Sequence, residues 1–231
     1  MGKLIVIEGT DGSGKSTQFR LLKERLEAEG YIFRTLVFPQ YAKESSALIR
    51  MYLGGEFGNS PGDVNAYAAS TFYAVDRYAS YKQDWGKWYE DGGLILSDRY
   101  TTSNAVHQTV KEPEDKQEAF LQWLFELEHE KMGLPKPDLV IYLDVPTEFT
   151  DKLLRSREQS TNTSADIHEK DLEYLAACRK AGRKAAAQYG WKIIQCVREN
   201  EMRTIEDIHS EIYEMVLRAV CTSPQVELSQ L

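Results

Sequence analysis

The chain has 231 residues, a net charge of −8 and 42% hydrophobic residues. This length and apolar content allow one large α/β domain or two small ones and exclude a disordered chain. The acidic balance argues against a surface that coats nucleic acid, and no apolar run is long enough to span a membrane. The three cysteines (Cys178, Cys196 and Cys221) are scattered without metal-ligand spacing, as is typical of a reduced, cytoplasmic protein.

The clearest chemical signal follows the first apolar run, Leu4–Ile7. It has the spacing G-x-x-x-x-G-K-[ST] of a phosphate-binding loop and leads into an amphipathic helical segment. Glycines let the backbone wrap a phosphate chain, while N–H groups and the helix N-terminus face the anion. We expect Lys15 to bind the β- and γ-phosphates and the Ser16 hydroxyl to ligate Mg²⁺. The residues expected to bind the nucleoside triphosphate are Gly9, Thr10, Asp11, Gly12, Ser13, Gly14, Lys15, Ser16 and Thr17.

Short apolar segments along the chain have the character of strands buried on both faces of a parallel sheet. They are Leu4–Glu8, Arg34–Phe38, Leu94–Asp98, Leu139–Asp144 and Lys192–Val197. Because helical patterns separate them, we predict an α/β fold: a doubly wound, five-stranded parallel sheet of the P-loop NTPase type, flanked by helices. Ligands of such a fold bind at the carboxyl ends of the strands. We expect residues 1–220 to form a single domain and residues 221–231 to form a flexible tail.

Helical patterns cover about Ser45–Leu53 and Val64–Tyr89, with a glycine-rich loop over Leu53–Gly62 between them. Tyr73 and Arg77 lie one helical turn apart in the second pattern. An aromatic ring and a guanidinium on one face can stack on and hydrogen-bond a planar ring. A core-facing tyrosine and a surface arginine have the same spacing, and the pattern alone favours that arrangement.

Asp98 and Arg99 end the third predicted strand. A carboxylate at that position can hold Mg²⁺ or its waters, and an arginine beside it can bridge two phosphates; a strand-end salt bridge is the alternative. Asn104 and Gln108 follow in a helix and lie four residues apart, so both can face one pocket. Polar side chains on a solvated helix face have the same pattern.

Arg155 and Arg157 begin a polar stretch over residues 155–169. Such a stretch is typical of a lid that closes over phosphates, and a plain surface loop has the same composition. Helical patterns over about His168–Tyr189 and Ile205–Val220 complete the chain. The histidines are not spaced as metal ligands, so we expect no zinc site.

No Asn-Lys-x-Asp motif for reading a guanine base occurs, so a small-molecule kinase is favoured over a GTPase. The chain resembles the thymidylate kinase family over nearly its whole length. The phosphate loop alone would indicate only the superfamily, and the other motifs are more selective. The resemblance rests on the phosphate loop with Asp11 inside it, Phe38-Pro39, Tyr73–Arg77, Asp98-Arg99-Tyr100 followed by Ser103-Asn104, and Asp166-x-x-Glu169.

The resemblance implies a Mg²⁺- and ATP-dependent kinase that converts dTMP to dTDP, and a homodimer. It implies catalytic roles for Asp11, Lys15, Arg99 and the lid arginines Arg155 and Arg157, and metal ligation by Ser16 and Asp98. The acceptor contacts that it implies are Asp11, Phe38, Tyr41, Tyr73, Arg77, Arg99, Asn104, Gln108 and Glu169.

The chain departs from the family pattern at two places. Gln40 and Tyr41 follow Phe-Pro, where the family commonly has an arginine that holds the acceptor phosphate; Lys43 and Arg50 are the nearby cations. His168 stands where an aromatic residue is usual, which bears on discrimination against a ribose 2′-hydroxyl. A kinase with another deoxynucleotide or deoxynucleoside acceptor is therefore one alternative, and a non-catalytic nucleotide-binding protein is a second.

Overall fold

The structure is a computed structural model that describes residues 1–151, 153–154 and 171–221. The expected lid arginines Arg155 and Arg157, the expected acceptor contact Glu169 and the tail from residue 222 onward lie outside these ranges. Among the helices of the described ranges, none has the length and apolar character needed to cross a bilayer.

The main sheet contains five strands, all parallel, in the order β2-β3-β1-β4-β5. Their bounds are β1 Lys3–Gly9, β2 Phe33–Val37, β3 Leu94–Asp98, β4 Leu139–Asp144 and β5 Lys192–Gln195. The predicted doubly wound parallel α/β fold is confirmed, and the first four strands match their predicted ranges to within one residue at each end.

The prediction of a single strand over Lys192–Val197 is wrong at its C-terminal end. β5 ends at Gln195, and the chain leaves the main sheet at Cys196. Val197–Arg198 (β6) then pairs antiparallel with Glu201–Met202 (β7) in a separate two-stranded sheet. The apolar character continues through Val197, so the sequence pattern does not mark the residue at which the pairing partner changes.

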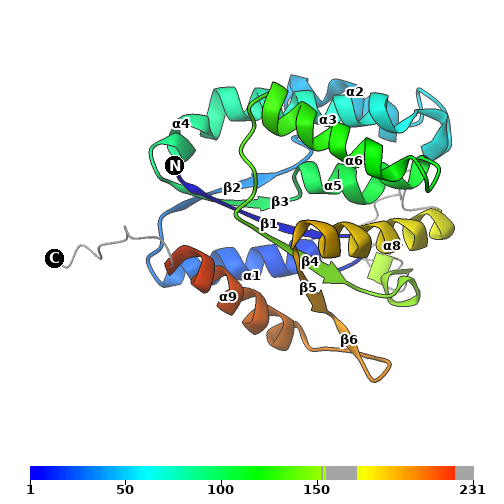
Figure 1. The fold of residues 1–231 in the computed structure, drawn as a ribbon. Helices are drawn as coiled ribbons and strands as arrows, with labels where there is room; N and C mark the ends of the chain where they lie inside the picture. The colour runs from blue at the N-terminus through cyan, green and yellow to red at the C-terminus, as the bar shows by residue number, and fades with distance from the viewer. Residues whose placement is uncertain (152, 155–170, 222–231) are drawn as a thin grey trace.

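Helices cover both faces of the main sheet (Figure 1). Their bounds are α1 Lys15–Ala28, α2 Ala47–Leu53, α3 Ala66–Ser80, α4 Gly86–Glu90, α5 Thr101–His107, α6 Gln117–Phe125, α8 Leu172–Tyr189 and α9 Ile205–Cys221. In the view of Figure 1, α1 and α9 lie below the sheet, while α2, α3, α4 and α6 form a layer above it. Two π-helical turns extend helices of the upper layer: Tyr81–Trp85 joins α3 to α4, and Glu126–Lys131 continues α6.

The central strand β1 contributes to two cores. Ile5 and Ile7 pack in the cluster that contains the apolar faces of α1 and α9. Leu4 and Val6 pack in the cluster on the opposite face of the sheet. Because successive side chains of a strand point to opposite faces, a strand covered on both sides must be apolar at consecutive positions. This explains the unbroken apolar run that precedes the phosphate loop.

The strand register places the candidate site. In the parallel pairing of β1 with β3, Ile7 lies opposite Asp98, and in the pairing of β2 with β3, Val37 lies opposite Asp98. The segments that follow β1, β2 and β3 therefore leave the sheet at one edge and close together. This edge is the topological position at which open α/β sheets bind their ligands.

Candidate active site

The predicted phosphate loop joins β1 to α1 as a tight turn. Gly14 has φ 84°, a left-handed conformation that disfavours any residue with a Cβ, and α1 begins at the next residue. A Cβ on Gly12 would lie 2.7 Å from the Thr150 carbonyl oxygen, so the loop passes too close to its neighbour for a larger residue. No side chain caps the N-terminus of α1. Its first N–H groups are thus arranged as those of an anion-binding helix start.

Lys15 is buried and turned back on the loop, where its Nζ donates to the Thr10 carbonyl oxygen at 2.8 Å. Burial, together with the positive charge of Arg99, lowers the pKa of Lys15 to about 8, against the opposing effect of the nearby carboxylates. A phosphate bound in the loop would place a negative charge beside this buried ammonium group. Ser16, the next residue, is exposed at the helix start.

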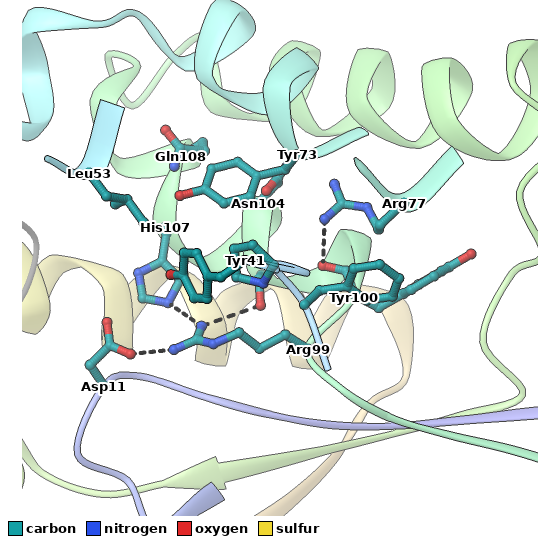
Figure 2. Close-up of a pocket in the computed structure, with 13 residues that line it drawn as sticks. Asp11, Tyr41, Leu53, Tyr73, Arg77, Arg99, Tyr100, Asn104, His107 and Gln108 are labelled. Atoms are coloured by element: carbon teal, nitrogen blue, oxygen red, sulfur yellow. Dashed lines mark hydrogen bonds and ion pairs between the residues drawn. The ribbon is translucent and has the colours of Figure 1, made fainter. Parts of the chain in front are cut away.

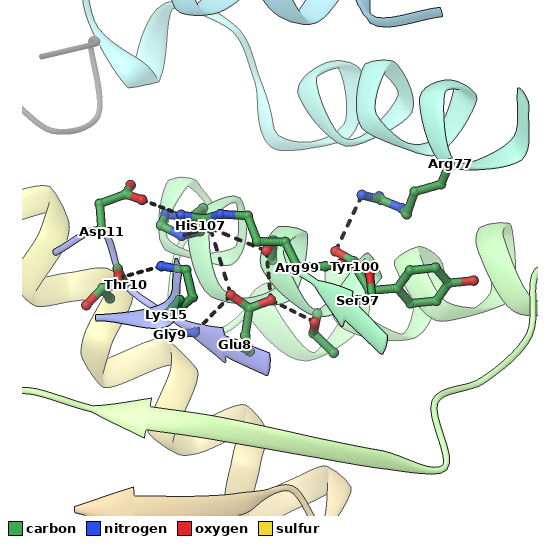
Figure 3. A network of polar contacts seen from close by, with 12 residues as sticks. Glu8, Gly9, Thr10, Asp11, Lys15, Arg77, Ser97, Arg99, Tyr100 and His107 are labelled. Atoms are coloured by element: carbon green, nitrogen blue, oxygen red, sulfur yellow. Dashed lines mark hydrogen bonds and ion pairs between the residues drawn. The ribbon is translucent and has the colours of Figure 1, made fainter. Parts of the chain in front are cut away.

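A network of two carboxylates and one arginine lies beside the loop (Figure 3). Arg99 forms ion pairs with Asp11 through Nη2 and with Glu8 through Nη1, the latter at 3.8 Å. Glu8 is fully buried, and its Oε2 accepts hydrogen bonds from the hydroxyls of Thr102 at 2.8 Å and Ser103 at 2.7 Å. The network thus joins the phosphate loop, the end of β3 and the first turn of α5. Sequence reasoning missed Glu8.

His107 is a second residue that sequence reasoning missed. The Nη1 of Arg99 lies 3.2 Å from its Nε2, and 3.4 Å from the hydroxyl of Ser103. Because a guanidinium only donates hydrogen bonds, Nε2 must accept, which puts the proton of the neutral ring on Nδ1. The helical spacing was the available signal, since His107 follows Asn104 by three residues and so shares a face with it.

A cavity of about 140 Å³ opens next to this network (Figure 2). Every predicted acceptor contact within the described residues lines it: Asp11, Phe38, Tyr41, Tyr73, Arg77, Arg99, Asn104 and Gln108. Residues that were not predicted complete the lining: Pro39, Leu53, Tyr100, Ser103 and His107. Asn104 and Gln108 are buried, so the alternative of a solvated helix face is wrong for both.

Arg77 is buried at the side of this cavity, with 1% of its surface exposed. The arrangement that the spacing alone favoured, a surface arginine, is therefore wrong. Its guanidinium pairs with the carboxylate of Glu128, through Nε to Oε2 at 2.6 Å and Nη2 to Oε1 at 2.5 Å. Burial by itself lowers the pKa of Arg77, but the Glu128 carboxylate raises it overall, so this arginine stays charged.

The segment after Phe38-Pro39 is anchored to α3. The backbone N–H of Gln40 donates to the carboxylate of Asp76 at 2.8 Å, and the Gln40 side chain donates to Ser80 at 3.0 Å. Arg50 donates to the Tyr41 carbonyl oxygen at 2.8 Å. Neither Lys43 nor Arg50 is among the cavity-lining residues, whose cations are Arg77 and Arg99.

The predicted metal ligands fit a magnesium ion that is held largely by phosphates. Asp98 is buried, and its Oδ1 has no hydrogen-bond partner among the described residues. A buried carboxylate oxygen without a donor is suited to a hard cation or its waters. Over the described ranges, no group of three or more His, Cys, Asp or Glu residues gathers as a self-sufficient metal site. Mg²⁺ is usually bound by one or two protein oxygens, with the remaining ligands from phosphates and water.

The fold and this site indicate a class, the P-loop kinases, because a phosphate-binding type of loop lies beside a small cavity that two arginines line. The family model for thymidylate kinase matches residues 7–212. The chain is 33% identical to the thymidylate kinase of Mycobacterium tuberculosis over 81% of this chain and 87% of that protein. It is 31% identical to a probable thymidylate kinase of Pyrococcus horikoshii, over 93% and 96%. The chain belongs to the thymidylate kinase family and is a nucleoside monophosphate kinase.

The fold also matches a solved structure. A thymidylate kinase from Candida albicans superimposes with a TM-score of 0.69 at 21% sequence identity, covering 94% of this chain and 92% of that one. At this identity the match bears on the fold, in agreement with the five-stranded sheet described above.

Proposed function

We propose that this protein transfers the γ-phosphoryl group of ATP to the 5′-phosphate of dTMP, giving dTDP. The observation that carries the proposal is that the phosphate loop forms part of the wall of the acceptor cavity. Asp11 belongs to the phosphate loop and lines the acceptor cavity, and it pairs there with Arg99, which lines the same cavity. A donor phosphate in the loop and an acceptor phosphate in the cavity would meet at this pair.

The residues would act by positioning and by neutralising charge, because phosphoryl transfer passes through a loose transition state. Lys15 would exchange its hydrogen bond to Thr10 for the donor phosphates. Arg99 would turn from Asp11 toward the acceptor phosphate, with Glu8 and His107 keeping its guanidinium at the edge of the cavity. The acceptor is already an anion, so no general base is required.

Mg²⁺ would be held by the Ser16 hydroxyl and, directly or through water, by the free oxygen of Asp98. When bound, it would supply positive charge that neutralises the donor phosphates.

At the far end of the cavity, Tyr73 would stack on the pyrimidine ring, and Arg77 and Asn104 would contact its polar edge. Phe38, Tyr41 and Gln108 would complete the acceptor site. We assign Arg155 and Arg157 to a closing lid and Glu169 to the acceptor sugar on the family resemblance alone, as parts of a single kinase domain over residues 1–220.

The test is the rate of ADP release with ATP·Mg²⁺ against dTMP, dUMP, dCMP, UMP and thymidine. We expect dTMP to be the best acceptor. Neither Gln40 nor Tyr41 carries a positive charge, and this favours one competing outcome, a preference for a different acceptor. If another acceptor gives a higher rate, that acceptor replaces dTMP in the proposal. If none of the five acceptors is phosphorylated although ATP binds, the proposal is overturned in favour of a non-catalytic nucleotide-binding protein.

The variant Lys15→Ala tests the donor side of the site. Its kcat should fall by a factor of roughly 10³, because removal of one well-placed charge-stabilising group costs about 10²–10³ in other enzymes. The matched control is Lys87→Ala, since Lys87 lies on α4 with 87% of its side chain exposed. Near-normal turnover of Lys15→Ala would contradict the assigned phosphate loop.

A further inference from the structure

A buried ion pair stands behind the acceptor cavity. Arg77 and Glu128 expose 1% and 0% of their surfaces, and two parallel hydrogen bonds join them. Such bidentate pairs fix the plane of the guanidinium as well as its position. Removing one partner of a buried pair is strongly destabilising, whereas the whole pair contributes little net stability. A role beyond stability therefore has to come from what the pair orients.

The pair leaves Arg77 with few free donors, and these face the cavity. A guanidinium has five N–H groups, and Glu128 takes one on Nε and one on Nη2. Nη1 donates to the Tyr100 carbonyl oxygen at 3.4 Å. In Figure 2 the guanidinium of Arg77 lies at the end of the cavity where Tyr73 and Asn104 project. Its remaining N–H groups are thus aimed where a planar base would lie.

Glu128 itself does not line the cavity. It lies in the π-helical turn Glu126–Lys131 after α6, and π-helical turns occur frequently at functional sites. Its Oε2 also accepts a hydrogen bond from the hydroxyl of Thr101 at 2.7 Å. The carboxylate is therefore anchored to the first residue of α5 without lining the cavity.

We propose that Glu128 is the positioning residue that orients Arg77 and thereby selects acceptors with a carbonyl, rather than an amino group, at the base edge. A charged guanidinium can only donate hydrogen bonds, so it stabilises a carbonyl oxygen and repels an amino group. Fixed in one orientation, it discriminates thymine and uracil from cytosine. This inference rests on the proposed function, because it takes the base of a pyrimidine nucleotide to lie at this end of the cavity.

The test is Glu128→Gln, which keeps the shape of the side chain but removes the charge and one of the two acceptor oxygens. We expect the KM for dTMP to rise about tenfold or more, because an Arg77 guanidinium that is no longer held in one orientation loses its charge-assisted hydrogen bond to the base. The kcat and the KM for ATP should change by less than roughly threefold. The preference for dTMP over dCMP in kcat/KM should shrink by about tenfold, and Glu128→Asp should recover part of it because it keeps the charge.

The matched control is Glu126→Gln. Glu126 belongs to the same π-helical turn and pairs with Lys131 at 3.0 Å, but 52% of its side chain is exposed. Its kinetic constants should equal those of the wild type, since exposed pairs contribute little. If Glu128→Gln does not fold, Thr101→Val replaces it as the test, because it removes only the hydrogen bond to Oε2 and should raise the KM for dTMP without changing that for ATP.

The outcomes separate the two proposals. A wild type that does not phosphorylate dTMP overturns the proposed function and the role of Glu128 with it. An active wild type overturns only the role of Glu128 in two cases. In the first, a folded Glu128→Gln, or Thr101→Val in its place, keeps both the KM for dTMP and the dTMP-to-dCMP preference. In the second, the kinetic constants for ATP and dTMP deteriorate together, which indicates a purely structural role.

Discussion

Arg99 combines an unusual backbone conformation with ion pairs to two carboxylates. It is one of three non-glycine residues with positive φ among the described residues, at 69°. This conformation costs a residue with a Cβ roughly 1–2 kcal/mol. In this conformation the Arg99 N–H donates to the Ile7 carbonyl oxygen at 3.2 Å, while the side chain reaches Asp11 and Glu8. The strained backbone thus places one guanidinium between two carboxylates of the neighbouring strand and its loop.

The lowered pKa of Lys15 predicts a pH dependence. With a pKa of about 8, the side chain is mostly charged at pH 7 and becomes neutral as the pH rises above 8. A neutral amine does not attract phosphate, so kcat/KM for ATP should fall by about tenfold per pH unit above that value. The substrate phosphates lose their second proton near pH 6 and do not titrate in this range.

The measurement is kcat/KM for ATP between pH 7 and 9.5 at saturating dTMP and Mg²⁺. The kcat at saturating ATP should decline only at higher pH, because bound phosphates favour the charged lysine and raise its pKa. A flat kcat/KM up to pH 9.5 would show that the free enzyme does not depend on this ammonium.

The residues of the site differ in how well the sequence around them predicts a functional role. Asp11 and Arg99 lie in recognisable motifs. Glu8 carries a weaker signal, since its position in the strand alternates in phase with Leu4 and Val6 and so places it on their face of the sheet, where it accepts hydrogen bonds from α5. Glu128 carries none, because it lies 51 residues from Arg77 and no local periodicity relates the two.

At the scale of elements, the loop after β2 depends on a helix that follows it in the chain. Asp76 of α3 is 1% exposed and accepts hydrogen bonds from the Gln40 N–H at 2.8 Å and the Ser45 hydroxyl at 2.6 Å. These bonds tie the Phe38-Pro39 segment, which lines the cavity, to the helix that carries Arg77. One carboxylate thus couples two walls of the acceptor site.

We expect Asp76→Asn to lower the free energy of unfolding by about 1–3 kcal/mol, because the amide NH₂ would face one of two donors. The KM for dTMP should rise while the KM for ATP stays unchanged. Urea denaturation and steady-state kinetics measure the two effects. Asp91→Asn is the control, because the i,i+4 pair of Asp91 with Lys87 is exposed and contributes about 0.5 kcal/mol or less. Equal stabilities of the two variants would contradict the anchoring role.

The sequence predicted elements best where one periodicity governs a long segment. The predicted helix over about Val64–Tyr89 corresponds to α3, a π-helical turn and α4, and the strands of the sheet centre match closely. The prediction from the sequence was wrong at the end of β5, where the pairing partner changes within an apolar run. The two-residue turn of the β6–β7 hairpin consists of Glu199 and Asn200, both at positive φ, without the glycine that usually signals such a turn.

At the scale of the whole molecule, α3 presents an apolar stripe outward. Tyr67, Val75 and Tyr78 are 37%, 44% and 39% exposed and recur at helical spacing on one face. Exposed apolar surfaces of this kind are typical of association sites. We expect this stripe to form part of a two-fold interface in a homodimer.

The variant Val75→Glu should convert the dimer to monomers, because an unpaired carboxylate would be buried in the interface at a cost of several kcal/mol. Sedimentation equilibrium at micromolar concentration measures this. Ile32→Glu is the matched control, since Ile32 is 77% exposed outside α3. A monomeric wild type, or a Val75→Glu variant that remains dimeric, would contradict the assignment of this surface.

The adjacency of β1 and β3 has a consequence for how reactions in this site could diversify. Ile7 and Asp98 are register partners, so the strands that lead into the phosphate loop and into Arg99 lie one interstrand spacing apart, a distance of about 4.8 Å in any sheet. Backbone hydrogen bonds set this spacing, so a side-chain substitution does not change it. We therefore expect changes of acceptor to arise at the end of the cavity where α3 and α5 contribute Tyr73, Arg77 and Asn104, while the spacing between the two strands stays constant.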